Sequence, residues 1–291
     1  MKSAQLDPSD DMKEILLKAA IGNVPPLEGM RALVTGGGHG IGAAICRELA
    51  RAGASVAIVD IRTGPSQALL GEIIAGGGTA ICVTADISQE NGCLAAVREC
   101  VAELGGLDIL VNCAAPGRDR SMLGKLTDVD WEVHHQTVLG AAINLTNAAL
   151  DHLAASGNGS VVNISSVTGA VIAVDQCSWP YHVSKAGLDQ LTRWLAVRVG
   201  ARGVRVNAVS PGLVDRDLTP KLTDKPEHRA IVNSVVPLRR AGTGQDIANA
   251  VTFLVSKQSA YITGQVLIVD GGLGINEVFG ASLRAYNANT T

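Results

Sequence analysis

The chain has 291 residues, of which 47% are hydrophobic and only 3% aromatic, and its 24 basic and 27 acidic side chains give a formal net charge of −3. This composition excludes a disordered chain and leaves no basic footprint for nucleic acid or an acidic membrane surface. No apolar run reaches the roughly 20 residues that a bilayer span requires. We therefore expect a folded protein with a large aliphatic core and neither a nucleic-acid nor a membrane partner.

The N-terminus and the cysteines predict the compartment. The first eleven residues are polar and acidic, which does not fit a secretory signal. Six cysteines are scattered along the chain, without a Cys-x-x-Cys pair or a histidine at zinc-finger spacing. These features predict reduced thiols, no metal site and a cytoplasmic location.

Residues 1–28 are expected to form an N-terminal extension. Ser9 or Asp10 is placed to cap a short amphipathic helix that ends at Gly22, and two prolines then break the chain. The favoured interpretation is an arm that packs on its own domain or on a sister subunit. The alternative is a regulatory or partner-docking helix.

From residue 29 onward, short Val/Ile/Leu-rich runs alternate with Ala/Leu-rich helical stretches. Most runs are apolar throughout, which is typical of parallel strands buried on both faces. The alternation predicts an α/β fold in one domain over 29–273, a Rossmann-type doubly wound sheet of about seven parallel strands with helices on both faces, followed by a tail at 274–291. The strand candidates are Ala32–Thr35, Ser55–Asp60, Ala80–Thr84, Ile109–Asn112, Ser160–Ile164, Arg205–Val209 and Val266–Val269.

A glycine-rich turn follows the first predicted strand. It reads Thr35-Gly36-Gly37-Gly38-His39-Gly40-Ile41-Gly42, and a helical stretch comes next. Glycines at 36, 40 and 42 permit a tight turn and a close approach of backbone to a pyrophosphate, which a helix N-terminus attracts. The order of strand, turn and helix predicts a dinucleotide site. The alternative is a turn with a purely structural role.

Asp60 closes the second predicted strand, 18 residues after Gly42. A carboxylate there suits the adenosine ribose hydroxyls and repels a 2′-phosphate, which favours NAD over NADP. His39 and Arg62 are nearby cations that would soften this preference. We interpret Arg62 as a solvated loop residue, with a phosphate ligand as the alternative.

The sequence Tyr181-His182-Val183-Ser184-Lys185 opens a long Ala/Leu-rich helix. The i, i+4 spacing places the phenol and the ammonium on one helical face. A phenol ordinarily ionises near pH 10, so a tyrosine base near neutrality needs its phenolate stabilised by about 4 kcal/mol, and an adjacent lysine and a cationic nicotinamide are suitable sources. Upstream, Ser165 and Ser166 follow a buried strand, at the sheet edge where ligands bind.

These motifs resemble the short-chain dehydrogenase/reductase family over roughly 29–272. Further matching segments are Ala85-Asp86-Ile87, Val111–Ala115, Val162–Ser166, Asn207–Gly212 and Tyr261–Gly272. The resemblance implies that Tyr181 is the general acid/base, that Ser166 holds the substrate oxygen, and that Lys185 binds the nicotinamide ribose and favours the phenolate. Tyr181 and Lys185 then serve the cofactor site as well.

The resemblance also implies a set of cofactor contacts. Asp86 is expected at the adenine ring, Asn112 along the cofactor near the reversal of strand order, and Val214 near the carboxamide. The full set of implied cofactor-binding residues outside the catalytic trio is Gly36, Gly38, His39, Gly40, Ile41, Asp60, Ile61, Asp86, Ile87, Asn112, Ala114, Pro211, Gly212 and Val214.

The expected function is hydride transfer between a nicotinamide cofactor, with NAD favoured, and a small-molecule secondary alcohol or ketone. One alternative is an NADPH-dependent carbonyl reductase in which His39 and Arg62 take the 2′-phosphate. The other is a catalytically weak cofactor-sensing or scaffold protein. Family members are commonly tetramers or dimers, which implies a homotetramer or homodimer built on the helices after Trp131 and Tyr181.

The chain departs from the family pattern at several positions. Val138 stands where the family usually has an asparagine that organises a water chain to the lysine, so we hypothesise that water from a neighbouring cavity replaces this relay. Cys113 is expected to be a small buried residue rather than a nucleophile. Fourteen residues separate Ser166 from Tyr181, two more than is common, and within them Trp179 is expected either to line a substrate pocket or to pack on the protein's own surface.

Three further expectations concern the substrate side. The segment Leu213–Val236 is expected to form a pocket wall with the character of a mobile lid. The residues 118–120, Arg-Asp-Arg, are interpreted as solvated loop charges, with recognition of an anionic substrate as the alternative. His134, His135 and His182 are expected to face solvent or a neighbouring helix rather than to act as bases.

Overall fold

The computed structural model describes residues 25–116, 127–174, 176–215, 221–277 and 280. Within these residues, seven strands form one sheet in the order β3-β2-β1-β4-β5-β6-β9, and every neighbouring pair is parallel. The prediction of a doubly wound sheet of about seven parallel strands is confirmed. The strands are β1 (Arg31–Thr35), β2 (Ser55–Asp60), β3 (Thr79–Thr84), β4 (Ile109–Asn112), β5 (Ser160–Ile164), β6 (Arg205–Pro211) and β9 (Val266–Val269).

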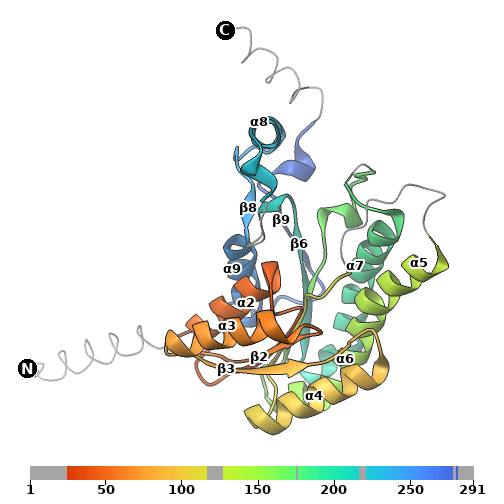
Figure 1. Ribbon diagram of the computed structural model, residues 1–291. Helices are drawn as coiled ribbons and strands as arrows, with labels where there is room; N and C mark the ends of the chain where they lie inside the picture. The colour runs from red at the N-terminus through yellow and green to blue at the C-terminus, as the bar shows by residue number, and fades with distance from the viewer. Residues whose placement is uncertain (1–24, 117–126, 175, 216–220, 278–279, 281–291) are drawn as a thin grey trace, which may run out of the picture.

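Helices cover both faces of this sheet (Figure 1). They are α2 (Gly40–Arg51), α3 (Thr63–Ala75), α4 (Glu90–Leu104), α5 (Asp128–His134), α6 (Ala141–Ala155), α7 (Trp179–Val199), α8 (Pro226–Val235) and α9 (Gly244–Val255). Between α5 and α6 the chain runs through a π-helical turn, η1 (His135–Gly140). Two short strands, β7 (Val214–Asp215) and β8 (Gly242–Thr243), pair with each other beside the main sheet.

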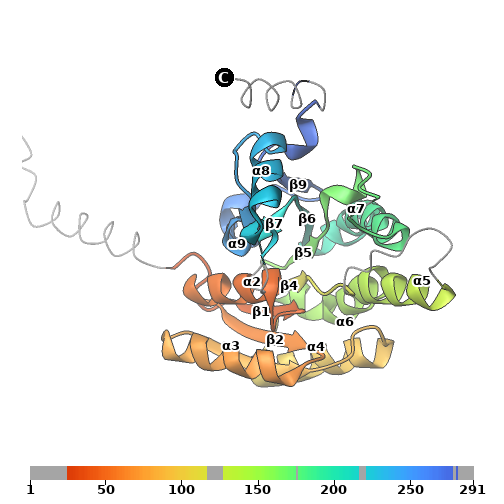
Figure 2. The same cartoon turned by 45° about the horizontal axis from the view of Figure 1, so that its top comes forward.

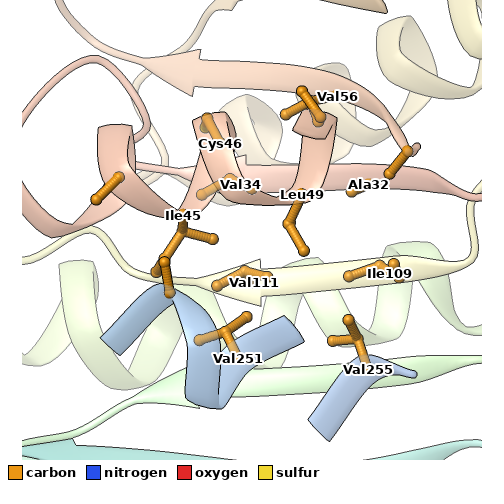
Figure 3. Close-up of a cluster of buried hydrophobic side chains, with 14 of the residues drawn as sticks. Ala32, Val34, Ile45, Cys46, Leu49, Val56, Ile109, Val111, Val251 and Val255 are labelled. Atoms are coloured by element: carbon orange, nitrogen blue, oxygen red, sulfur yellow. The ribbon is translucent and has the colours of Figure 1, made fainter. Parts of the chain in front are cut away.

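Alternate residues of the central strands feed two separate cores, because successive side chains of a strand point to opposite faces. On one face, Val34 packs with side chains of α2, α3 and α9, and Figure 3 shows Ile45 and Leu49 of α2 meeting Val251 and Val255 of α9 there. On the other face, strand side chains pack with α4, α6 and α7. Burial on both faces explains why these strands read as continuous apolar runs.

The order of the strands reverses between β1 and β4. The chain moves from β1 outward through β2 to β3, then crosses back to β4 and continues to β5, β6 and β9. Ligands of open α/β sheets bind beyond the carboxyl ends of the strands at such a reversal. The segments that follow β1, β4 and β5 all leave the sheet at this edge.

Several sequence predictions concern segments that lie wholly or partly outside the described residues. The predicted helix near the N-terminus and the charges at 118–120 lie outside them, as does most of the C-terminal tail. Of the segment 213–236, the structure describes β7, a 3-10 turn and α8, and Figure 2 shows α8 at the end of the molecule opposite α4. Among the described helices, none combines the length and the apolar character needed to cross a membrane.

Candidate active site

The glycine-rich turn closes on itself directly beyond β1. Gly36 and Gly40 have φ of 63° and 57°, in the left-handed region that favours glycine. A Cβ on Gly42 would lie 2.1 Å from the carbonyl oxygen of Gly36, so this position excludes any side chain. His39, the N-cap of α2, makes no side-chain capping bond. The first N–H groups of α2 therefore lack a side-chain cap, and the turn has the shape and dipole of a pyrophosphate cradle.

Asp60 lies buried at the end of β2, beside this turn. Its Oδ2 accepts a hydrogen bond from the Gly38 N–H at 3.1 Å, and its Oδ1 accepts one from the Arg62 N–H at 3.0 Å. Burial disfavours the charged carboxyl, but the hydrogen bonds from His39, Arg62 and Gly38 outweigh it and lower the Asp60 pKa below its ordinary value. Asp60 is therefore a carboxylate at neutral pH, held in one orientation.

Two basic side chains stand on the outer side of Asp60. His39 Nδ1 is 3.4 Å from Asp60 Oδ2, and Arg62 Nη2 lies 2.7 Å from the same imidazole nitrogen. The Arg62 side chain is half-exposed, lies 3.9 Å from Asp60 Oδ1 and lines the cavity, so both a solvated loop residue and a phosphate ligand stay open. The carboxylate and the two bases form a cluster at one end of the cavity described below.

The Ser166, Tyr181 and Lys185 side chains lie together beyond the end of β5, and all three are buried. Lys185 Nζ donates to the Ile164 carbonyl at 2.7 Å and lies 5.6 Å from the centroid of the Tyr181 ring. Ser166 Oγ accepts from the Thr168 hydroxyl at 2.9 Å, which leaves the serine's own proton available for donation. The i, i+4 spacing thus places phenol and ammonium side by side, as predicted.

A buried polar chain attaches α7 to the sheet. Asn112 Nδ2 donates to Asn163 Oδ1 at 2.8 Å, and Asn163 Nδ2 donates to Thr192 Oγ1 at 2.9 Å. These bonds connect β4, β5 and α7. Because buried hydrogen bonds are directional and costly to break, they fix the height of α7, and hence of Tyr181 and Lys185, relative to the strand ends.

One cavity of about 660 Å³ joins the two ends of the site. Ser166, Tyr181 and Lys185 line it, together with most of the predicted cofactor-binding residues: Gly36, His39, Gly40, Ile41, Asp60, Ile61, Asp86, Ile87, Ala114, Pro211, Gly212 and Val214. Gly38 and Asn112 do not line it. Gly38 lies behind Asp60 and Asn112 belongs to the polar chain under α7.

Sequence reasoning missed the local structure around His134. Its side chain is 3% exposed and meets the Tyr181 ring edge-on, with centroids 6.4 Å apart. Nδ1 lies 2.9 Å from the Asp130 carbonyl and therefore carries the proton, while Nε2 is buried without a partner. His134 does face a neighbouring helix, but no sequence signal indicated that the residue it meets is Tyr181.

Val138, Cys113 and Trp179, the residues at which the sequence departs from the family pattern, lie in different surroundings. Val138 is buried with Ala142 and Leu188, inside the π-helical turn. Cys113 is half-buried and lines the cavity. Trp179 stacks on Trp131 at 5.4 Å and is absent from the cavity wall, so it packs on the protein's own surface.

The cysteines of the described residues are free thiols. All six cysteines belong to this part of the chain, and none forms a disulfide. Burial raises the pKa of Cys93 to about 11 and that of Cys100 to about 12, which keeps both thiols protonated. No cluster of metal-binding side chains occurs within the described ranges.

A cradle of backbone N–H groups, a carboxylate at the end of β2 and a Ser/Tyr/Lys trio around one cavity define a dinucleotide-dependent oxidoreductase. Comparison with known proteins agrees. The chain matches, over residues 36–274, a family model described as enoyl-(acyl carrier protein) reductase. It is 36% identical over 243 residues to 3-oxoacyl-(acyl-carrier-protein) reductase FabG of Chlamydia muridarum, covering 83% of this chain and 96% of the relative.

Two further matches extend the comparison. Nodulation protein G of a Rhizobium species is 34% identical, with 86% of this chain and 98% of that protein covered. A solved short-chain dehydrogenase/reductase from Serratia marcescens is 31% identical, covers 86% of this chain and 99% of its own, and superposes with a TM-score of 0.78. The chain belongs to the short-chain dehydrogenase/reductase family, and it is an oxidoreductase of the kind that works with a nicotinamide cofactor.

Proposed function

We propose that the protein transfers hydride between NAD(H) and a secondary alcohol or its ketone, with Tyr181 as the general acid/base. The observation that carries this proposal is the single cavity lined both by the Asp60 carboxylate and by Ser166, Tyr181 and Lys185. A pure binding module has no chemical need for the trio. The glycine cradle and the uncapped start of α2 fit a dinucleotide, and the carboxylate fits a ribose with free hydroxyls.

The bound nicotinamide supplies or accepts the hydride. In oxidation, the Tyr181 phenolate takes the proton of the substrate hydroxyl, and in reduction the Tyr181 phenol returns a proton to the carbonyl oxygen. Ser166 Oγ donates a hydrogen bond to the same oxygen and fixes its position. Lys185 places a positive charge beside the phenol, where it favours the phenolate, and the Ile164 carbonyl holds its ammonium in place.

The first test separates catalysis from binding. Tyr181→Phe removes the phenolic oxygen and preserves the ring that packs on His134, so we expect NADH binding within threefold of wild type and a loss of turnover of at least 100-fold. Val183→Thr, an exposed change two residues away in the same helix, is the matched control and is expected to keep full turnover. Full activity in Tyr181→Phe would disprove the assigned role. Absence of turnover in the wild type with every alcohol and ketone would favour the cofactor-sensing alternative.

The second candidate is an NADPH-dependent carbonyl reductase. It is favoured by the two basic side chains at Asp60, since His39 and the half-exposed Arg62 would meet a 2′-phosphate. The Chlamydia muridarum relative is named a 3-oxoacyl-(acyl-carrier-protein) reductase, which supports carbonyl reduction as the direction of this candidate. Fluorescence titration with NADH and NADPH decides between the two. Tenfold tighter NADH supports the first proposal, and tighter NADPH supports the second.

We propose further that the chain works as a homotetramer or homodimer, with α6 and α7 in a shared face. Trp194 and Val197 on α7 are 59% and 85% exposed, and burial of such side chains would stabilise an interface. Light scattering at micromolar concentration is expected to give a multiple of 30.0 kDa. A monomer would contradict the proposal. The cytoplasmic location and the domain limits 29–273 stay predictions.

A further inference from the structure

Two aromatic pairs pack α5 against the first turn of α7 (Figure 1). Trp131 of α5 stacks on Trp179, with ring centroids 5.4 Å apart and ring planes at 20°. Further along α5, His134 meets the ring of Tyr181 edge-on, with centroids 6.4 Å apart and ring planes at 86°. Because residues three apart lie on the same face of a helix, Trp131 and His134 belong to one contact between the two helices.

Tyr181 lies in the part of α7 that the helix itself holds least firmly. It is the third residue of α7, where backbone N–H groups have no intrahelical partner and helix ends fray. The N-cap residue, Ser178, makes no side-chain capping bond. Contacts of the ring therefore decide how the phenol is oriented. One of them is with Lys185, whose Nζ lies 5.6 Å from the ring centroid, and another is with His134.

The His134 side chain is itself fixed in place. It is 3% exposed, and its Nδ1 donates to the Asp130 carbonyl at 2.9 Å, one turn back in α5. Its Nε2 is buried and has no hydrogen-bond partner among the described residues. An unpartnered buried nitrogen costs stability that an apolar side chain would keep, so filling the core does not account for a histidine here. A flat ring held by a bond to its own helix does suit an edge-on contact with another ring.

His134 acts through Tyr181 and not on the substrate directly. Neighbouring side chains of α5 and of the π-helical turn line the cavity, but His134 is not among the described residues that do so. We propose that His134 is a positioning residue, whose ring holds the Tyr181 phenol at the angle that meets the substrate oxygen. This inference rests on the proposed function, in which Tyr181 is the general acid/base. Orientation matters at this place because a displacement of about 1 Å can lower a rate by about 100-fold.

The test compares His134→Phe, which keeps an aromatic ring, with His134→Leu, which fills a similar volume without one. Both remove the unpartnered nitrogen, so we expect both to fold, and urea unfolding checks this. Turnover is measured on the full-length protein with NADH and whichever of butanone, cyclohexanone and ethyl acetoacetate the wild type reduces fastest.

In His134→Leu, kcat is expected to fall by about tenfold, the population ratio that an edge-on aromatic pair typically sets, while the Kd for NADH stays within twofold of wild type. In His134→Phe, kcat should stay within threefold of wild type. Val129→Thr, an exposed change on α5, is the matched control and is expected to keep full turnover.

The outcomes separate this inference from the function on which it rests. Full turnover in His134→Leu would overturn the inference, and so would an equal loss in His134→Phe and His134→Leu, since neither result gives the ring a role. A joint loss of NADH binding and turnover in His134→Leu would show a structural role only, which also overturns it. Full activity in Tyr181→Phe, or no turnover of any ketone by the wild type, would overturn the proposed function together with the inference.

Discussion

Asp60→Ser is the substitution that addresses cofactor choice most directly. The Asp60 carboxylate is 6% exposed and is fixed by the N–H groups of Gly38 and Arg62 at 3.1 and 3.0 Å. Because these bonds and His39 lower its pKa below the ordinary value, the negative charge is present throughout the neutral range and is lost only as the pH falls through that lowered value. Serine removes the charge and keeps a small polar group.

The expected difference in affinity between NADPH and NADH follows from the charges around the 2′-position. A 2′-phosphate about 5 Å from a carboxylate, at an effective dielectric constant of about 20, is repelled by about 3 kcal/mol per unit charge. His39 and the half-exposed Arg62 offset part of this repulsion. A net penalty of about 2 kcal/mol corresponds to roughly 30-fold weaker binding of NADPH than of NADH. Asp60→Ser also removes the charge-assisted hydrogen bonds to the ribose of NADH, so the affinity for NADH should fall by about tenfold.

The assay is a fluorescence titration of wild type, Asp60→Ser and Asp86→Asn with both cofactors. Asp60→Ser is expected to reverse the preference, with NADPH strengthened and NADH weakened. Asp86→Asn changes a carboxylate of the same cavity away from the ribose cluster, so it should weaken both cofactors alike. A wild type that prefers NADPH, and that loses this preference in Arg62→Gln, would refute the reasoning and assign the cluster to phosphate binding.

Three other predictions follow from the packing. Gly42→Ala forces a Cβ to within 2.1 Å of the Gly36 carbonyl oxygen, so both cofactor affinity and the free energy of unfolding should fall, the latter by more than about 1 kcal/mol in urea unfolding. Val138→Asn buries an amide in an apolar cluster, and we expect kcat within threefold of wild type but reduced stability; a tenfold faster turnover would show that the native proton route is impaired. Cys93 and Cys100 ionise near pH 11 and 12 when folded but near 8.5 when unfolded, so the free energy of unfolding should fall as the pH rises from about 8.5, and less steeply in Cys93→Ala.

Strands were the most predictable part of this fold. Runs such as Ile109–Asn112 are apolar throughout because both faces of the sheet are covered, and the same burial makes them visible in the sequence. The glycine turn and the Tyr181/Lys185 pair were predictable for a different reason, since each depends on spacing along one local element. Boundaries were less exact, and β6 extends to Pro211, two residues beyond its prediction.

Contacts between distant elements were not predictable in the same way. Asn112 was expected along the cofactor, but its amide bonds to Asn163 and lies outside the cavity wall, which depends on the pairing of β4 with β5. The stack of Trp131 on Trp179 joins residues 48 positions apart and has no local signature. Likewise, no periodic pattern in a single sequence indicates the π-helical turn at His135–Gly140.

The surroundings of Val138 in that π-helical turn bear on the route by which a proton leaves Tyr181. Val138 faces the apolar cluster with Leu188, while Gln136 and Thr137 of the same turn line the cavity. The polar groups of this turn that meet the cavity therefore lie on its open side, and the side that packs on α7 is apolar. We therefore expect a proton leaving Tyr181 to reach solvent through the active-site cavity rather than through the helix pair, and water entry from a neighbouring cavity stays a hypothesis. Lys185 is 2% exposed, bonded to the Ile164 carbonyl and part of the cavity lining, so among the described surroundings we expect the cavity to be the side from which water reaches this route.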